Sequence, residues 1–93
     1  MIGESTTCGY GVLGDGPRCD FSAEAQPFAW GALAARELGA THTTIAYSGK
    51  GVWRNVSNDH GPVMPELFHR TLPDEAGSAW GFHSQPAAVV VNL

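Results

Sequence analysis

The sequence has few positively charged residues, and they are scattered singly along the chain. Five Lys and Arg stand against nine Asp and Glu, which gives a formal net charge of −4 at pH 7. Nucleic-acid binding needs a concentrated basic surface that neutralises phosphates, so the composition argues against this class of function. No apolar run approaches the roughly 18 residues that suggest a membrane-spanning helix. We therefore expect no nucleic-acid or membrane partner, and no partner protein is evident.

Cysteine is also scarce, because the chain has only Cys8 and Cys19, one on each side of a glycine-rich stretch. Their spacing matches neither a Cys-x-x-Cys redox motif nor a zinc site, and we expect no bound metal. Two main alternatives stay open: a disulfide that closes the stretch, or two free, half-buried thiols. We expect the cysteines to pair if the protein is exported, because they bracket a single flexible excursion of the chain.

Glycine and proline are concentrated in one early region. Residues 8–26 hold four glycines and Pro17, which predicts a long loop of the kind that is often functional. A hydrophobic content of 43% with 15% charged residues is typical of a globular protein rather than a disordered one. At 93 residues, we expect one domain at most.

The segment 27–39 has the start and stop signals of a helix. Pro27 suits a first helical turn, where its missing N–H costs nothing, and Gly39 suits the position just after the last turn. Between them, helix-forming residues predict a helix over 28–38. Its apolar residues fall on one face, namely Phe28, Ala32, Ala35 and Leu38.

Two later segments have the character of strands, with a short helix between them. Residues 41–47 are β-branched and predict a strand, and Pro65 opens a short helix over 65–70. The apolar run 87–93 predicts a strand that is buried on both faces of a covered parallel sheet. Together with the apolar stub before Gly3, the sequence predicts an α/β protein with a βαβαβ unit of parallel strands.

The distinctive residues follow the strands, at the edge where parallel α/β sheets bind ligands. Ser5 follows the first strand and could act as a nucleophile, or it could only cap a turn. Gly49 follows the second strand, where a missing side chain lets a substrate oxygen approach the N–H, or it could be an ordinary turn glycine. Lys50 and Arg54 are expected to be solvated loop residues.

Several segments, in order, resemble the SGNH (GDSL-type) hydrolases, and most closely the acetyl esterases of carbohydrate esterase family two. Gly3-Glu4-Ser5-Thr6-Thr7-Cys8-Gly9-Tyr10-Gly11 is similar to the family's first block, Gly-Asp-Ser-Ile-Thr-(Cys/Ala)-Gly-Tyr-Gly. Ser48-Gly49-Lys50-Gly51-Val52-Trp53-Arg54-Asn55 is similar to the second block, and Val89 to Leu93 to the strand before the third. Between these blocks, the segments that fit are Cys19 to Ser22, Gly31 to Leu38, Met64 to Phe68 and Arg70 to Leu72.

The resemblance implies a three-layer, flavodoxin-like SGNH hydrolase fold and a serine esterase that uses no metal or cofactor. It makes Ser5 the expected nucleophile and, through its N–H, one oxyanion donor, with Gly49 as the second donor. Trp53 is expected either to stack on a sugar beside the cleft or to anchor its loop. The implied substrate is a carbohydrate that carries O-acetyl or other small acyl esters, such as acetylated xylan or glucomannan. An extracellular location is implied, although the chain itself leaves a cytoplasmic one open.

The chain departs from the family pattern at three points. The family's Asp is Glu4 here, and the usual aliphatic residue after the serine is Thr6. No position matches the third-block asparagine or the catalytic histidine, because Asn92 precedes that block and no histidine is in the catalytic position. We therefore expect residues 1–93 to be part of an esterase domain, with both groups beyond Leu93, and to be inactive alone.

Two other functions stay open. A thioesterase or lysophospholipase-like member of the same superfamily would use the same serine, and a non-catalytic carbohydrate-binding remnant would keep the cleft alone. The glycine-rich loop and residues 51–55 favour the carbohydrate branch.

Overall fold

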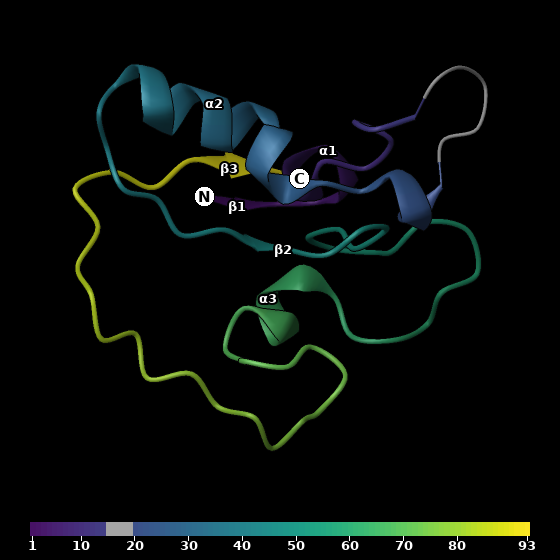
Figure 1. Cartoon of the computed structure of the whole chain (residues 1–93). Coiled ribbons are helices and arrows are strands. Elements are labelled where there is room, and N and C mark those ends of the chain that lie inside the picture. Colours follow the sequence, from purple (N-terminus) through teal and green to yellow (C-terminus); the bar gives the residue numbers. More distant parts are fainter. Residues whose placement is uncertain (15–19) are drawn as a thin grey trace.

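The chain forms a small parallel sheet at the centre of an α/β fold (Figure 1). The computed structural model describes residues 1–14 and 20–93. In this part of the chain, the strands are β1 (Ile2–Gly3), β2 (Ile45–Ala46) and β3 (Val91–Asn92), in the spatial order β2-β1-β3. Both neighbours of β1 run parallel to it, with Ile2 opposite Ile45 on one side and Val91 on the other. The predicted parallel α/β architecture is confirmed.

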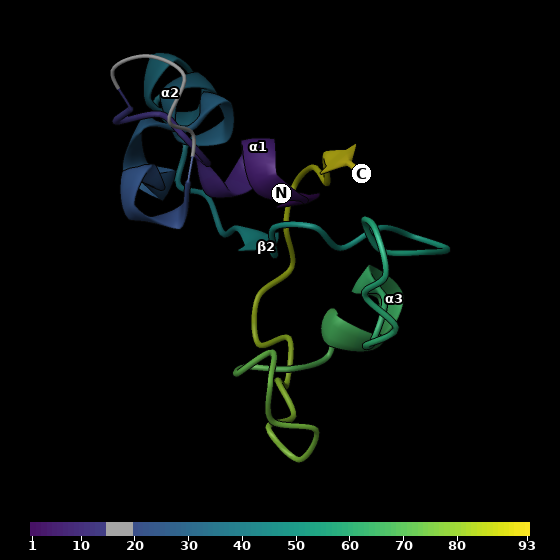
Figure 2. The ribbon, with the colours of Figure 1, turned by 90° about the vertical axis from the view of Figure 1, so that its right-hand side faces the viewer.

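Helices lie on both sides of this sheet, which gives the three layers of the predicted fold. α2 (Trp30–Glu37) lies on one side of the strands and α3 (Met64–Leu67) on the other (Figures 1 and 2). α2 contributes the buried Ala32 and Ala35, and α3 contributes the buried Met64 and Leu67. The burial of Ala32 and Ala35 agrees with the apolar face predicted for this helix.

The predicted first helix is confirmed in its centre and at its C-terminal end. Gly39 has φ 61° and its N–H donates to Arg36 O at 3.1 Å, while the N–H of Ala40 donates to Ala35 O at 2.9 Å. These two bonds form a Schellman motif, in which glycine tolerates the left-handed backbone. The predicted start at residue 28 is wrong, because Pro27 lies in a separate 3₁₀ turn (Gln26–Phe28), and extended backbone at Ala29 divides the two.

The short helix α1 (Ser5–Cys8) lies between β1 and the predicted loop and was not expected from the sequence. It starts directly after β1 and ends at Gly9, so Ser5 opens a helical turn rather than a loop. A 3₁₀ turn (Phe21–Ala23) follows later, and the side chain of Asp20 accepts its Ser22 N–H at 2.9 Å. The long excursion after β1 therefore contains structured turns.

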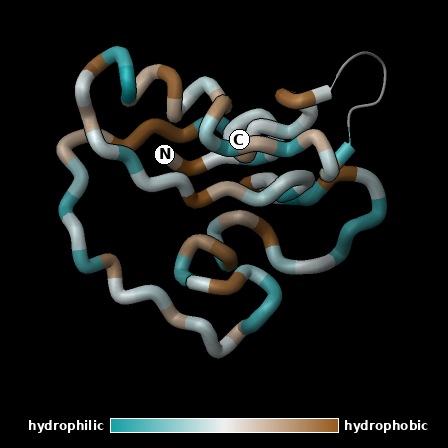
Figure 3. Tube along the Cα trace, in the orientation of Figure 1, coloured by the Kyte–Doolittle hydropathy of each residue, from teal (hydrophilic) through white to brown (hydrophobic). Residues whose placement is uncertain are grey.

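The prediction that residues 87–93 are buried on both faces is wrong for this structure. All seven are exposed, and Val91 itself is 59% exposed. The physical reason is that β3 is an edge strand that pairs with β1 alone, and among the described residues no helix makes extensive contact with it to cover its side chains. Figure 3 shows the chain that enters β3 as an apolar stretch, in contrast to the more polar chain that leads to it.

Candidate functional site

An open cleft lies at the carboxyl edge of the sheet and collects residues from all three strand ends. Its volume is about 450 Å³. Ser5 lines it two residues after β1, Gly49 three residues after β2, and Leu93 directly after β3. The lining is Glu4, Ser5, Gly49, Lys50, Gly51, Arg54, Asn55, Val56, Ser57 and Leu93. The structure therefore brings together Ser5 and Gly49, which the sequence placed at one sheet edge.

Among the described residues the Ser5 hydroxyl does not contact a histidine but donates a hydrogen bond to the Glu4 carboxylate, at oxygen Oε2. The other carboxylate oxygen, Oε1, accepts from the Thr6 N–H at 3.1 Å and from the Thr6 hydroxyl at 2.6 Å. Burial raises the pKa of Glu4, but hydrogen bonds from Ser5 and Thr6 outweigh it and hold the pKa below its usual value. Glu4 is thus an ionised acceptor for both residues that follow it.

Gly49 occupies a tight turn that leaves its own N–H unused. The Lys50 N–H donates to Tyr47 O at 3.2 Å, and Gly49 has φ 80°, as expected for the third residue of a type II turn. Among the described residues no acceptor pairs with the Gly49 N–H. The two sequence interpretations of Gly49 are therefore compatible, since a turn glycine can also present a free donor to the cleft.

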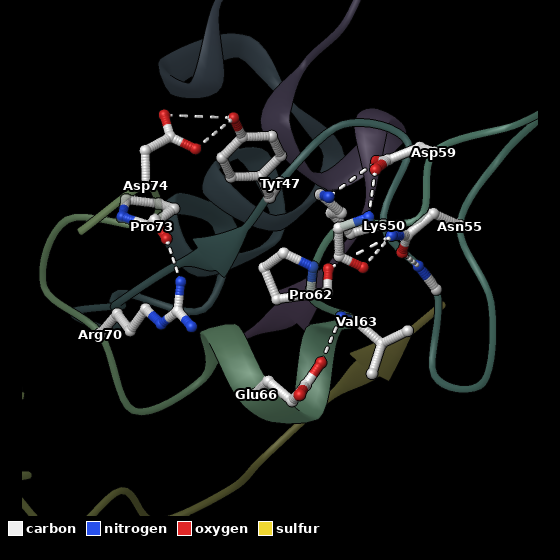
Figure 4. Close-up of polar contacts among 12 residues, drawn as sticks. Tyr47, Lys50, Asn55, Asp59, Pro62, Val63, Glu66, Arg70, Pro73 and Asp74 are labelled. Atoms are coloured by element: carbon white, nitrogen blue, oxygen red, sulfur yellow. Dashed lines mark hydrogen bonds and ion pairs between the residues drawn. The ribbon is translucent and has the colours of Figure 1, made fainter. Parts of the chain in front are cut away.

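The loop after Gly49 is closed by Asn55, whose contribution sequence reasoning missed (Figure 4). Asn55 is 8% exposed, and its amide donates to the carbonyls of Gly61 at 2.9 Å and Pro62 at 3.2 Å. Its side-chain oxygen accepts from the Gly51 N–H at 3.3 Å. No signal in the sequence pointed to these contacts, because the partners of Asn55 are backbone groups.

Lys50 was predicted to be solvated, and this is wrong. Its side chain is 10% exposed, and its ammonium forms an ion pair with Asp59 at 2.7 Å. The hydrogen bond from Lys50, followed by one from the Gly61 N–H, lowers the pKa of Asp59. This pair lies beside Asn55 and holds the same loop, since the Gly61 backbone contacts both Asp59 and Asn55 (Figure 4). It also removes Lys50 as a free positive charge for an anionic ligand.

Two further contacts fasten the polar segment that follows α3 (Figure 4). The Tyr47 hydroxyl donates to the Asp74 carboxylate at 3.1 Å, and the Arg70 guanidinium donates to Pro73 O at 2.8 Å. Tyr47 lies directly after β2, so the first contact ties this segment to the strand whose end carries Gly49.

Trp53 and the histidines lie outside the lining of the cleft. Trp53 is 91% exposed and points into solvent rather than anchoring its loop. His42, His60, His69 and His83 are all exposed, and none of them lines the cleft. In the part of the chain that the structure describes, Ser5 therefore has no histidine base at the cleft, and no group of metal-ligating side chains is present. That part also contains no helix both long and apolar enough to cross a membrane.

The predicted pairing of Cys8 with Cys19 involves a residue outside the described part of the chain, so it stays a prediction. Cys8 itself is buried at the end of α1, and this burial raises the pKa of its thiol. Near Cys8, the Ser48 hydroxyl donates a hydrogen bond to the Glu24 carboxylate at 2.9 Å. This bond links the glycine-rich excursion to the turn that carries Gly49.

Comparison with known proteins gives consistent matches, although no family model matches the chain. The whole chain aligns at 36% identity with the cellulase/esterase CelE of Acetivibrio thermocellus and spans 12% of it. A carbohydrate esterase family 2 enzyme with a carbohydrate binding domain, from Corynascus thermopiles (Myceliophthora fergusii), superposes with a TM-score of 0.89 at 41% identity. That match covers 99% of this chain and 30% of the other.

A third match is a family two carbohydrate esterase from Clostridium thermocellum in complex with cellohexaose. Its TM-score is 0.78 at 34% identity, over 87% of this chain and 25% of that one. The two solved structures are both family two carbohydrate esterases and share the fold of this chain, and the curated relative is also an esterase by name. The chain spans less than a third of the length of each.

Proposed function

We propose that this chain supplies the nucleophile of a carbohydrate esterase, because it is similar over its whole length to part of carbohydrate esterase family two enzymes. The reaction is the hydrolysis of O-acetyl or other small acyl esters on sugar hydroxyls. The observation that carries the proposal is the meeting of Ser5 and the unused Gly49 N–H in one open cleft.

In this mechanism Ser5 Oγ attacks the ester carbonyl and its proton passes to a base. The carbonyl oxygen becomes an oxyanion, which the N–H groups of Gly49 and Ser5 stabilise. The alcohol of the sugar then leaves with a proton, and water releases acetate from the acyl-serine by the reverse sequence of steps. Neither step draws on a metal or a cofactor.

A carbohydrate is the ligand class that the comparisons favour. One matched esterase was solved in complex with cellohexaose, and another carries a carbohydrate binding domain. The exposed indole of Trp53 lies on the loop that borders the cleft and offers a flat apolar face to a longer glycan. Since polysaccharides do not enter cells, we place the activity outside the cell.

The test is acetate release from acetylated xylan by the longest protein that contains this chain, compared between wild type and Ser5→Ala. We expect turnover to fall by several orders of magnitude, as when other hydrolases lose their nucleophile. Ser84→Ala, at an exposed serine outside the cleft lining, serves as the control and should leave turnover unchanged.

Two results would contradict the proposal. Undiminished acetate release by Ser5→Ala would remove Ser5 as the nucleophile. Preference for short-chain thioesters over acetylated sugars would instead favour the thioesterase branch of the superfamily, and sugar binding without turnover would favour a non-catalytic module.

A further inference from the structure

The two positions where the chain departs from the family's first block are hydrogen-bonded to each other. Glu4 stands in place of the usual aspartate and Thr6 in place of the usual aliphatic residue. The Thr6 hydroxyl donates to Glu4 Oε1 at 2.6 Å, and the Thr6 N–H donates to the same oxygen at 3.1 Å. The longer side chain of Glu4 is therefore accompanied by a threonine whose hydroxyl binds its carboxylate.

The same cluster extends to the last strand. The side-chain amide of Asn92 in β3 donates to Thr6 Oγ1 at 3.0 Å. A continuous chain of bonds thus runs from Asn92 to Thr6 to Glu4, and the Ser5 hydroxyl donates to the other oxygen of Glu4. Asn92 is 86 residues from Thr6 in the sequence, so this chain is a tertiary connection between β3 and the nucleophile turn.

The nucleophile turn needs such support because α1 has only four residues. A helix this short cannot sustain itself, since it makes almost no internal hydrogen bonds. Its first N–H groups depend on a capping side chain, and Glu4 is the residue that caps Thr6. Ser5 is the first residue of this turn, so the position of its Oγ depends on the cap.

We propose that Glu4 is a positioning residue for Ser5, held in place by Thr6 and Asn92. This inference rests on the proposed function of Ser5 and extends it to three residues that do not touch the substrate's reacting atoms. During turnover the Ser5 proton passes to the catalytic base, while the hydrogen bonds from Thr6 to Glu4 persist and hold the backbone of this turn in place. A displacement of the nucleophile by about 1 Å lowers turnover by up to roughly a hundredfold.

The experiment compares Thr6→Val with Thr6→Ser in the longest protein that contains this chain. Valine keeps the shape of threonine but removes the hydroxyl, and serine keeps the hydroxyl, while the exposed side chain of Thr6 makes packing changes small. Steady-state hydrolysis of 4-nitrophenyl acetate gives kcat and KM separately. Thermal melting of each variant checks that the fold is retained.

We expect Thr6→Val to lower kcat about tenfold, as loss of a hydrogen bond to a charged group does. Asn92→Ala should lower kcat about fivefold, because Asn92 donates to the neutral hydroxyl of Thr6, and KM should stay nearly unchanged in both variants. Thr6→Ser should retain at least half of the wild-type kcat. The double variant Thr6→Val/Asn92→Ala should be no worse than Thr6→Val alone, because both changes break the same chain.

The outcomes separate this inference from the proposed function. If Ser5→Ala is inactive but Thr6→Val and Asn92→Ala keep the wild-type kcat, or if their losses multiply, the positioning role is overturned and the esterase stands. A Thr6→Ser variant as slow as Thr6→Val also overturns it. If Ser5→Ala is fully active, the proposed function and the positioning role fail together.

Discussion

Replacement of Asn55 by alanine should open the loop that follows Gly49 at the cleft. The side chain of Asn55 makes three hydrogen bonds, to Gly61 O, Pro62 O and the Gly51 N–H, and it is almost fully buried. A net value of about 1 kcal/mol for each bond gives about 3 kcal/mol for local opening of the loop. Since a factor of ten corresponds to about 1.4 kcal/mol, local opening should become roughly a hundredfold more frequent.

Amide hydrogen exchange measures this opening directly. The reporters are the N–H groups of Val56 and Met64, which donate to Gly49 O and Gly51 O at 2.9 Å each and are released when the loop opens. Both should exchange roughly a hundredfold faster in Asn55→Ala if exchange follows the open population.

Asn58→Ala is the matched control for this measurement. Asn58 is exposed on the same loop, and its side chain has no hydrogen-bond partner in the described structure. Exchange at Val56 and Met64 should therefore stay at the wild-type rate in Asn58→Ala. If Asn55→Ala behaves like this control, Asn55 does not hold the loop and the argument is refuted.

Two further predictions concern stability. Thr7 is 1% exposed, and among the described residues its hydroxyl has no hydrogen-bond partner. The isosteric Thr7→Val should therefore raise the free energy of unfolding by about 1 kcal/mol, measured by thermal melting. A decrease of that size would instead show that the hydroxyl is hydrogen-bonded in the folded protein. The pKa of Asp59 is lowered in the folded state by Lys50, so the ion pair stabilises its loop above the ordinary pKa of an aspartate, and this is lost as pH falls through the lowered pKa. Amide exchange at Gly61 followed from neutral to acidic pH should show the loss in the wild type and not in Asp59→Asn.

Local sequence signals predicted the parts of the fold that local physics decides. The Schellman motif at Gly39 and the buried Ala32 and Ala35 follow from residue type and helical spacing. Leu38 was expected on the same buried face and is 80% exposed, because it lies at the C-cap of α2, where the last turn ends. The helical spacing of apolar residues does not show how far along a helix the neighbouring elements cover it.

The sequence could place the site but not its internal contacts. Ser5 and Gly49 were predictable because parallel strands end at one edge, and their positions follow from where each strand stops. Asn55 and Asn92 were not, since an asparagine in a sequence gives no indication of which backbone or side-chain group it will meet. Those partners are 4 to 86 residues away, and the folded loop and sheet bring them together.

The state of Glu4 limits which group can activate Ser5 in the proposed mechanism. Glu4 is the one ionisable side chain that receives the Ser5 proton in a hydrogen bond, within the described structure. Its pKa is held below the usual range by that bond and by those from Thr6, and a base works best when its pKa lies near the working pH. A weaker base than an ordinary carboxylate cannot deprotonate a serine hydroxyl efficiently at neutral pH. The proposed reaction therefore requires a base of higher pKa, such as the histidine that the family resemblance implies, to approach Ser5 from a part of the protein other than the lining of this cleft.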